Sequence, residues 1–387
     1  MRQKSKRIVL ALSLCAALAC GAQPATWKPG KLVIAGGAIT TSKQELWRLI
    51  MAERLMGRSI GIISTASEKP AAIGKPLAAS LVAEHGADAA VFIPLDSKLD
   101  NANDPEIVAL IRRCGGFFFT GGNQSLTTRA LLKRDGSPTL ALAAIREIHR
   151  AGGVIGGSSA GAAIMSDPMI TGGASPAALA NGATPSGTPR SRQGVTIGRG
   201  LGFSPGILYC QHHLERGRFG RLLVALASDA VGLQTGFGVS EDTAVVVDHA
   251  ADRAWVIGAR DVVHLQAAGA TCADDGSITG VRLNYLTPGD RIRLSTGEVE
   301  PAHGKIAVSP GTDSKLIEIP NAWAREALRH LLIRLAQGSA TARAVAKDSR
   351  FTLVFQRTND SRVWCSTTDP KRWTMTGIHV EVKPTKE

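Results

Sequence analysis

Residues 157–161 read Gly-Ser-Ser-Ala-Gly, a G-x-S-x-G arrangement with Ser159 at its centre. The apolar stretch 153–157 predicts a strand before it, and the run 160–165 predicts a helix after it. A serine on such a turn is accessible, because the flanking glycines remove side chains that would clash. The start of the following helix directs backbone N–H groups at a developing oxyanion. Ser159 is therefore the candidate nucleophile.

The same turn has two other interpretations: a glycine-rich connection that packs a helix on a sheet, or a phosphate cradle. A P-loop would need Gly-Lys-Ser/Thr after the glycines, and the sequence lacks it. The glycine spacing also fails the dinucleotide fingerprint. A hydrolase thus leads the alternatives, while the pentapeptide alone leaves the packing interpretation open.

A serine hydroxyl needs a base, and His212 is the candidate among nine histidines. It ends an apolar stretch that begins at Ile207 and predicts a strand with a polar end. His213 competes for the base role, although neighbours on a strand point to opposite faces and both cannot serve. A carboxylate would hold the tautomer of the base, and Glu241 precedes another predicted strand, with Asp242 as its immediate rival.

The elements that must position these side chains alternate between strand and helix. Apolar runs that end in glycine or turn clusters predict buried strands at 31–37, 59–67, 116–124 and 153–157. Helical patterns fall at 42–56, 76–85, 104–113 and 140–151. The alternation predicts an α/β fold with a mostly parallel sheet covered on both faces, with the site at the carboxyl ends of the strands.

The second half of the chain is less regular. The Gly-, Ala-, Ser- and Pro-rich stretch 170–196 predicts a long loop near the site, followed by a helix over 216–229 and a strand from Thr243. A further helix is predicted from Asn321, as its N-cap, to Gln337. Strands are predicted at 351–356 and 378–382.

Taken together, four ordered motifs resemble the cyanophycinases, a serine peptidase family related to dipeptidase E on a scaffold similar to class I glutamine amidotransferases. The motifs are Gly-Gly-Asn-Gln at 121–124, the serine turn and its continuation at 156–169, Gln-His with the basic stretch at 211–222, and Ser-Glu-Asp-Thr-Ala at 240–244. The resemblance is collinear from about Leu32 to Leu294. It implies a three-layer αβα sandwich. After about residue 300 the pattern of the sequence changes, and a C-terminal α+β extension is expected there.

Carried over to this sequence, the resemblance implies roles for eight residues. Ser159 becomes the nucleophile, His212 the general base and Glu241 its orienting acid. The substrate pocket would contain Gln124, Gln211 and Arg221, and backbone N–H groups near Gly122 and Ala160 would form the oxyanion hole. This order of Ser, His and Glu differs from the Ser, acid, His order of α/β-hydrolases. Neither a metal nor another cofactor is expected.

Two departures from the family pattern bear on the substrate. The family usually has Asp and Phe around the Gln-His pair, whereas Cys210 precedes it here and His213 follows it. Loss of a carboxylate removes a partner for a guanidinium or a hydrogen bond, so the reaction type is better supported than the exact substrate. Within the basic stretch we expect Arg216 and Arg218 to lie on a solvated helix face, unlike Arg221.

The N-terminus predicts export. Residues 1–22 combine a basic start, an apolar run and small residues, which is typical of a signal peptide and too short to span a bilayer comfortably. We expect a periplasmic or secreted protein, with a lipid anchor at Cys20 as a minor alternative. The predicted domains are thus the signal at 1–22, a peptidase domain at 23–300 and a C-terminal extension at 301–387.

Composition limits the partners. The formal net charge is +13, but Lys and Arg are spread along the chain and aromatic residues make up only 4%, which argues against a nucleic-acid partner. No CxxC pair indicates a zinc or dithiol site, and Cys272 with Cys365 is the pair that export could oxidise. The expected partner is cyanophycin or another Asp- and Arg-containing peptide. A homodimer is compatible with the sequence, and no stable membrane span is expected.

The leading hypothesis is an exported serine exopeptidase that cleaves cyanophycin, multi-L-arginyl-poly-L-aspartate, into β-Asp-Arg dipeptides through an acyl-enzyme on Ser159. Two alternatives remain. One is a related dipeptidase on short Asp-containing peptides, and the other is a catalytically silent peptide-binding protein of the same fold.

Overall fold

The computed structural model describes residues 28–40, 43–229, 231–273, 275–309, 311, 315–338, 343–347 and 350–385. The predicted export signal at 1–22 lies outside these ranges, as does Ser42 at the start of the first predicted helix. No helix in the described ranges has the length and apolarity needed to cross a membrane.

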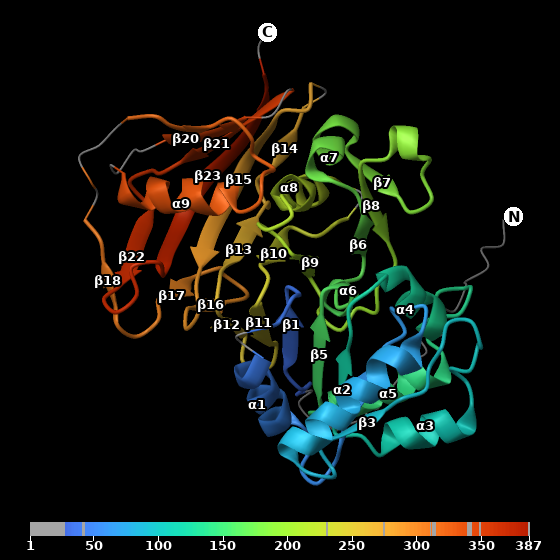
Figure 1. Ribbon diagram of the computed structural model, residues 1–387. Coiled ribbons are helices and arrows are strands. Elements are labelled where there is room, and N and C mark those ends of the chain that lie inside the picture. The colour runs from blue at the N-terminus through green and yellow to red at the C-terminus, as the bar shows by residue number, and fades with distance from the viewer. Residues whose placement is uncertain are drawn as a thin grey trace, which may run out of the picture.

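A parallel sheet forms the centre of the N-terminal half (Figure 1). Its parallel strands run in the order β1 (Leu32–Ala35), β5 (Val154–Ser158), β4 (Gly116–Phe119), β2 (Ile60–Ile63) and β3 (Ala90–Phe92). On the other side of β1 the sheet continues antiparallel through β11 (Thr243–Asp248), β12 (Arg253–Gly258), β16 (Arg291–Arg293) and β17 (Val299–Glu300). The predicted α/β fold with a mostly parallel central sheet is confirmed.

Helices cover both faces of this sheet, which explains why its strands are continuously apolar. On one face, α1 (Lys43–Glu53) and α2 (Pro70–His85) pack on Phe118 of β4. On the other, α3 (Pro105–Arg112) and α5 (Leu140–Arg150) share a core with Phe117 and Phe119. Consecutive phenylalanines of one strand therefore enter opposite cores, as strand alternation requires.

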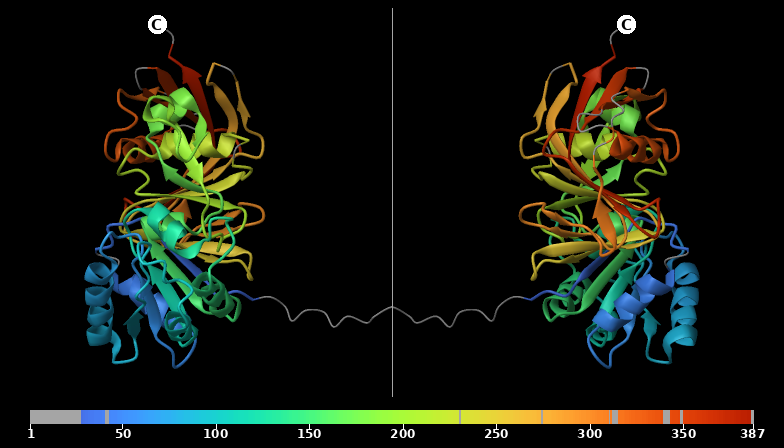
Figure 2. Two further views of the ribbon diagram at one scale, coloured as in Figure 1. Left: turned by 90° about the vertical axis from the view of Figure 1, so that its right-hand side faces the viewer. Right: turned by 90° about the vertical axis from the view of Figure 1, so that its left-hand side faces the viewer.

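A second, larger sheet occupies the C-terminal half (Figures 1 and 2). Its main path within the described residues is β9 (Ile207–Gln211), β10 (Thr235–Val239), β13 (Val262–Gln266), β15 (Ile278–Leu286), β23 (Trp373–Pro384), β21 (Phe351–Gln356), β20 (Arg343–Lys347) and β19 (Ile317–Ile319). β14 (Thr271–Cys272), β18 (Lys305–Ala307) and β22 (Arg362–Ser366) attach at its sides. The helices α8 (Phe219–Ala227) and α9 (Ala327–Gln337) pack on one face of it.

The second sheet joins residues on both sides of position 300. β15 pairs with β23, so the predicted C-terminal extension continues a sheet that starts at β9.

The prediction of a long loop over 170–196 is wrong. The segment contains β6 (Met169–Gly172), α7 (Ser175–Asn181), β7 (Ala183–Pro185), the short 3-10 helix Arg190–Arg192 and β8 (Val195–Gly198). β6, β7 and β8 form a small three-stranded sheet. Strands of three or four residues with Gly and Pro carry too little periodicity to be recognised in a sequence.

Several helix starts also differ from prediction. α2 begins at Pro70, not Pro76, so Pro76 lies inside it. α8 begins at Phe219, and α9 begins at Ala327, after Glu326 in a left-handed conformation (φ 62°). Asn321 instead accepts the N–H of Trp323 at 2.9 Å in a preceding turn.

Candidate active site

Ser159, His212 and Glu241 form a continuous hydrogen-bonded chain. His212 Nε2 lies 2.9 Å from Ser159 Oγ, and His212 Nδ1 lies 2.8 Å from Glu241 Oε1. The side chain of His212 is 6% exposed and that of Glu241 is 13% exposed. This is the geometry of a nucleophile, a base and an acid that fixes the tautomer of the base.

The turn that carries Ser159 is tightly packed. Ser159 has φ 55° and ψ −111°, a conformation that side chains rarely adopt, between β5 and the short helix α6 (Ala160–Ala163). A Cβ on Gly157 would lie 2.1 Å from the carbonyl oxygen of Gly161, and one on Gly161 would lie 2.1 Å from that of Phe119. Only glycine fits at both positions, which accounts physically for the flanking glycines of the motif.

The end of β1 connects all three catalytic segments. The carbonyl of Ala35 accepts the N–H of Ser159 at 3.0 Å, and that of Gly36 accepts the N–H of His212 at 2.8 Å. The carbonyl of Gly37 accepts the N–H of Asp242, next to Glu241, at 2.9 Å. Three consecutive carbonyls thus hold the nucleophile, the base and the acid segments in register.

Gly37 also makes room for the base. It has φ 114°, and a Cβ there would lie 2.2 Å from His212 Cε1 and 2.4 Å from Nε2. The sequence marks this position only as part of a glycine cluster after a strand, and its contact with the imidazole follows from the fold.

Burial and charge both affect His212. Burial lowers its pKa to about 4, the hydrogen bond with Glu241 opposes the shift, and Arg216 and Arg218 add to it. A neutral imidazole at neutral pH is the state that can accept the proton of Ser159. For Glu241, burial raises the pKa, but contacts with His212 and Arg325 outweigh burial and leave it below its ordinary value.

The structure separates both catalytic candidates from their sequence neighbours. Asp242 accepts the N–H of Thr40 at 2.7 Å and its hydroxyl at 3.0 Å, so its carboxylate is engaged away from the base. His213 is fully buried beside Phe219, and neither ring nitrogen has a hydrogen-bond partner among the described residues. Burial lowers the pKa of His213 to about 3.

The predicted oxyanion donors lie on either side of Ser159. Ala160 follows it directly, and the Gly121–Gly122 turn approaches it, since a Cβ on Gly121 would lie 3.2 Å from Ser159 Cβ. Within the described ranges, no backbone carbonyl accepts from the N–H of Gly122 or Ala160. Their role as an oxyanion hole stays a prediction.

The predicted substrate-binding side chains are largely engaged with the protein. Gln124 Nε2 donates to the carbonyls of Ile170 at 3.1 Å and Thr171 at 2.9 Å, which attaches α4 (Gln124–Leu131) to β6. Arg221 is buried and donates to Gln211 Oε1 at 2.9 Å and to Cys210 Sγ at 3.2 Å. The contact of these side chains with substrate stays a prediction.

Arg218 corrects a prediction. Instead of lying on a solvated helix face, it is half-buried and donates to the carbonyl oxygen of Gln211 at 2.9 Å and to its Oε1 at 3.3 Å. Burial lowers its pKa to about 10. Arg216, in contrast, is 52% exposed, as predicted, but it lies in the turn before α8 and not on a helix, 3.7 Å from Glu241.

The C-terminal segment reaches Glu241, a contact that the sequence does not indicate. Arg325 Nη2 donates to Glu241 Oε2 at 3.3 Å. Arg329 of α9 binds the buried carboxylates of Glu215 and Asp261. These carboxylates in turn accept the N–H of Glu241 at 3.0 Å and the hydroxyl of Ser240 at 2.6 Å. No local motif carries these contacts, because they join residues that are far apart in the chain.

The four described cysteines, Cys114, Cys210, Cys272 and Cys365, are free thiols. The structure therefore has no disulfide between Cys272 and Cys365, contrary to the pairing considered from the sequence. Both lie at the surface or partly exposed, on β14 and β22.

Comparison with known proteins gives the family. The chain is 29% identical to the cyanophycinase of Nostoc sp. over 293 residues, which are 73% of this chain and 92% of that protein. It is 30% identical to the cyanophycinase of Synechococcus elongatus over 250 residues (62% of this chain, 71% of that protein). For the cyanophycinase of Geminocystis herdmanii the identity is 31% over 246 residues (61% and 83%).

The chain belongs to the cyanophycinase family. This confirms the resemblance inferred from the four motifs at the level of the family. Among solved structures, a peptidase from an acI-B1 actinobacterium superposes with a TM-score of 0.52 at 19% identity, covering 69% of this chain and 98% of that one, which supports the fold alone. No family model matches the chain.

Proposed function

We propose that this protein is a serine exopeptidase that hydrolyses cyanophycin to β-Asp-Arg dipeptides. The observation that carries the proposal is the hydrogen-bonded chain from Ser159 through His212 to Glu241, with distances of 2.9 and 2.8 Å. Membership of the cyanophycinase family supports the choice of substrate.

The first half of the reaction forms an acyl-enzyme. Ser159 Oγ attacks the amide carbonyl carbon while its proton passes to His212 Nε2, and Glu241 stabilises the resulting imidazolium. The negative charge moves to the carbonyl oxygen, where the N–H groups of Gly122 and Ala160 would receive it. The C–N bond then breaks, and His212 returns the proton to the leaving amine.

The second half reverses these roles. Water attacks the ester carbonyl and gives its proton to His212, the bond to Ser159 Oγ breaks, and the proton returns to the serine oxygen. The products are a dipeptide with a free carboxyl group and the regenerated hydroxyl.

The decisive experiment incubates the purified protein with insoluble cyanophycin and looks for β-Asp-Arg by mass spectrometry. We expect release by the parent protein and none by Ser159→Ala. Release that persists in Ser159→Ala would contradict the assignment of the nucleophile. A serine-reactive phosphonate that fails to label Ser159 would favour the silent binding protein.

One observation supports a second candidate, a dipeptidase that acts on short Asp-containing peptides. Cys210 occupies the position where the family usually has Asp, and its Sγ accepts a hydrogen bond from Arg221. The site thus has one fewer carboxylate for the guanidinium of a β-Asp-Arg unit. Cleavage of short aspartyl peptides without release from cyanophycin would identify this activity.

We also propose that residues 1–22 direct export of the protein and are then removed. The basic, apolar and small-residue sequence of this segment supports the proposal. Mass spectrometry of the N-terminus after secretion tests it, and a cytoplasmic protein that retains Met1 would contradict it.

A further inference from the structure

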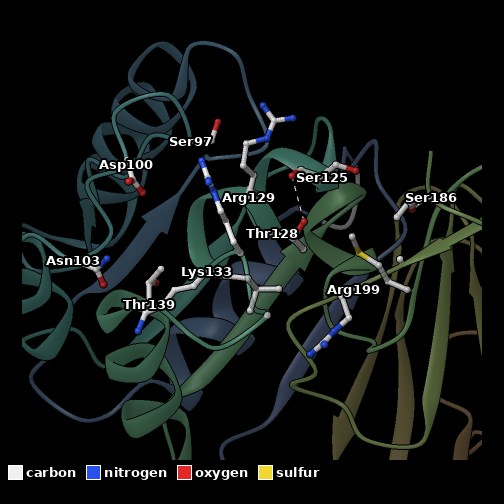
Figure 3. Close-up of a pocket in the computed structure, with 16 residues that line it drawn as sticks. Ser97, Asp100, Asn103, Ser125, Thr128, Arg129, Lys133, Thr139, Ser186 and Arg199 are labelled. Atoms are coloured by element: carbon white, nitrogen blue, oxygen red, sulfur yellow. Dashed lines mark hydrogen bonds between the residues drawn. The ribbon is translucent and has the colours of Figure 1, made fainter.

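A cavity of about 750 Å³ lies beside α4 (Figure 3). We call it the α4 cavity. It is formed by α4 with the turn after it, by the loop between β3 and α3, and by the sheet of β6, β7 and β8. It borders the contact between α4 and β6: Ser125 and Thr171 line it, and Gln124, next to Ser125, donates to the carbonyl oxygen of Thr171 at 2.9 Å.

The charge of the α4 cavity is strongly one-sided. Arg129, Lys133, Arg134 and Arg199 line it, against the single carboxylate of Asp100. Arg199 lies 3.3 Å from Asp167. Within the described residues, none of the other three cations has a carboxylate within salt-bridge distance of 4.0 Å. All four side chains are exposed, so they are available to a ligand.

The excess of positive charge at the α4 cavity does not simply follow from the basic composition of the chain. A cavity of about 390 Å³ between β12, β16 and β17 also has three arginines, but three carboxylates line it with them. There Arg291 lies 3.3 Å from Glu300, and Arg293 lies 3.9 Å from Glu298. Among the described residues, three of the four cations at the α4 cavity lack such partners, which leaves an attractive potential for an anion.

The residues that line the cavity indicate which class of anion would bind there. The lining combines cations with the hydroxyls of Ser97, Ser125 and Thr128, and none of the described residues that line the cavity is aromatic. Stacking of nucleic-acid bases is therefore not supported. Carboxylates suit guanidinium and ammonium donors well. Each single carboxylate would be attracted only weakly, but several carboxylates on one chain bind together and their attractions add.

We propose that the α4 cavity is an anchoring site for the carboxylate groups of an acidic peptide chain, which holds a polymer while another part of it is cleaved at Ser159. The proposal rests on the proposed peptidase function. Ser125, which lines the cavity, is four residues from Gly121, which approaches Ser159, so at most roughly 14 Å of extended chain separates Ser125 from Gly121. When one part of a polymer is bound in the α4 cavity, the effective concentration of its other parts at Ser159 increases.

The test measures binding, not cleavage. In the Ser159→Ala background, fluorescein-labelled poly-L-aspartate is titrated by anisotropy at low ionic strength. We expect Arg129→Glu/Lys133→Glu/Arg134→Glu to weaken binding by at least about tenfold, and to make it less dependent on salt. The matched control, Lys75→Glu/Arg113→Glu/Arg150→Glu, makes the same change in charge at exposed positions away from the cavity and should bind like the parent.

Equal binding by the cavity variant and the parent would overturn the proposal, as would an equal loss in the control. Tripolyphosphate, a single-stranded oligonucleotide and unlabelled poly-L-aspartate are then compared as competitors at equal concentrations of negative charge. The proposal would also be overturned if tripolyphosphate or the oligonucleotide displaced the labelled polymer at a lower charge concentration than unlabelled poly-L-aspartate does. If charge reversal prevents folding, the corresponding three Gln substitutions replace it, with the same expected direction.

A separate measurement distinguishes this proposal from the peptidase function. With Ser159 intact, the cavity variant should cleave a short peptide at the rate of the parent but a long polymer more slowly. If the parent cleaves neither the short peptide nor the long polymer, the peptidase function is contradicted, but the result of the binding experiment remains valid. Equal slowing of short and long substrates would contradict the anchoring role.

Discussion

His212 and His213 are adjacent in the sequence but have opposite surroundings. His212 contacts Ser159 and Glu241, whereas His213 lies in the core between Phe219 and Gly238. We expect His212→Ala to lower kcat by at least about 10⁴-fold, because it removes the base. His213→Leu should retain activity. Because it removes two unpaired buried nitrogens, its free energy of unfolding should stay within about 1 kcal/mol of that of the parent.

Steady-state kinetics and urea unfolding of both variants check this pair. Activity that survives His212→Ala and disappears in His213→Leu, with both proteins folded, would transfer the base role to His213.

The low pKa of His212 sets the expected pH dependence. Because the base must be neutral and its pKa is about 4, kcat/KM should be flat from mildly acidic to neutral pH and fall as the pH drops through about 4. The direction follows from burial, which disfavours the imidazolium. A pH profile with circular dichroism at each point checks it. An acid limb near the ordinary histidine value would show that burial does not control the base.

Gly37 illustrates how space limits a catalytic side chain. Gly37→Ala would place a methyl group 2.2 Å from His212 Cε1, so the imidazole must move. We expect kcat/KM to fall by about 100-fold, since displacement of a base by an ångström has effects of that size. Gly86→Ala is the matched control, because Gly86 also has a positive φ (101°) but no atom lies within 4 Å of its Cβ position. An equal fall in both variants would assign the effect to backbone strain.

At the scale of elements, α9 supports the catalytic acid from a distance. Arg329 compensates the buried carboxylates of Glu215 and Asp261, which bind the backbone of Glu241 and the side chain of Ser240. Arg329→Met would leave both carboxylates buried without this cation. We expect the free energy of unfolding to fall by about 3–5 kcal/mol, as for other broken buried pairs.

Urea unfolding measures this effect, with Arg334→Met as the control on the same helix. Arg334 is exposed, so its substitution should change the free energy of unfolding by no more than about 0.5 kcal/mol. Similar losses in the two variants would show that the helix, and not the buried ion pairs, determines the stability.

The elements also show how far a sequence predicts structure here. The strands around Val33, Ile62, Phe118 and Ile155 were predicted because each is buried on both faces and reads as an apolar run. The strands of the 170–196 segment were not, since they are short and held by pairing with one another. The second sheet was missed for a different reason: its order depends on pairs such as β15 with β23, about a hundred positions apart in the chain.

For the site, local motifs predicted which residues the fold brings together. Ser159 and His212 each follow a strand that the sequence predicts, and Glu241 precedes one. The supporting contacts of Gly37, Arg218, Arg325 and Arg329 depend on tertiary packing, and no spacing in the sequence indicates them.

At the scale of the whole molecule, the residues after 300 are part of the core. β23 pairs with β15, β21 and β22, and Lys305 forms a buried contact with Asp290 at 2.6 Å. Removal of 301–387 would expose these strands and leave Asp290 without its cation. We expect the shortened protein to lose cooperative thermal unfolding, and to be inactive.

Differential scanning calorimetry checks this prediction, with removal of 1–22 as the control that should leave the unfolding temperature unchanged. A cooperative transition in a soluble 23–300 protein would show that the peptidase domain is independent of its extension.

The carbonyls of residues 35–37 hold the amides of Ser159, His212 and Asp242, three segments that are otherwise separate in the chain. An opening of this one strand end would release all three amides to solvent together. Hydrogen exchange at these positions should therefore share a single opening free energy, and the site should be lost as one cooperative unit instead of fraying residue by residue.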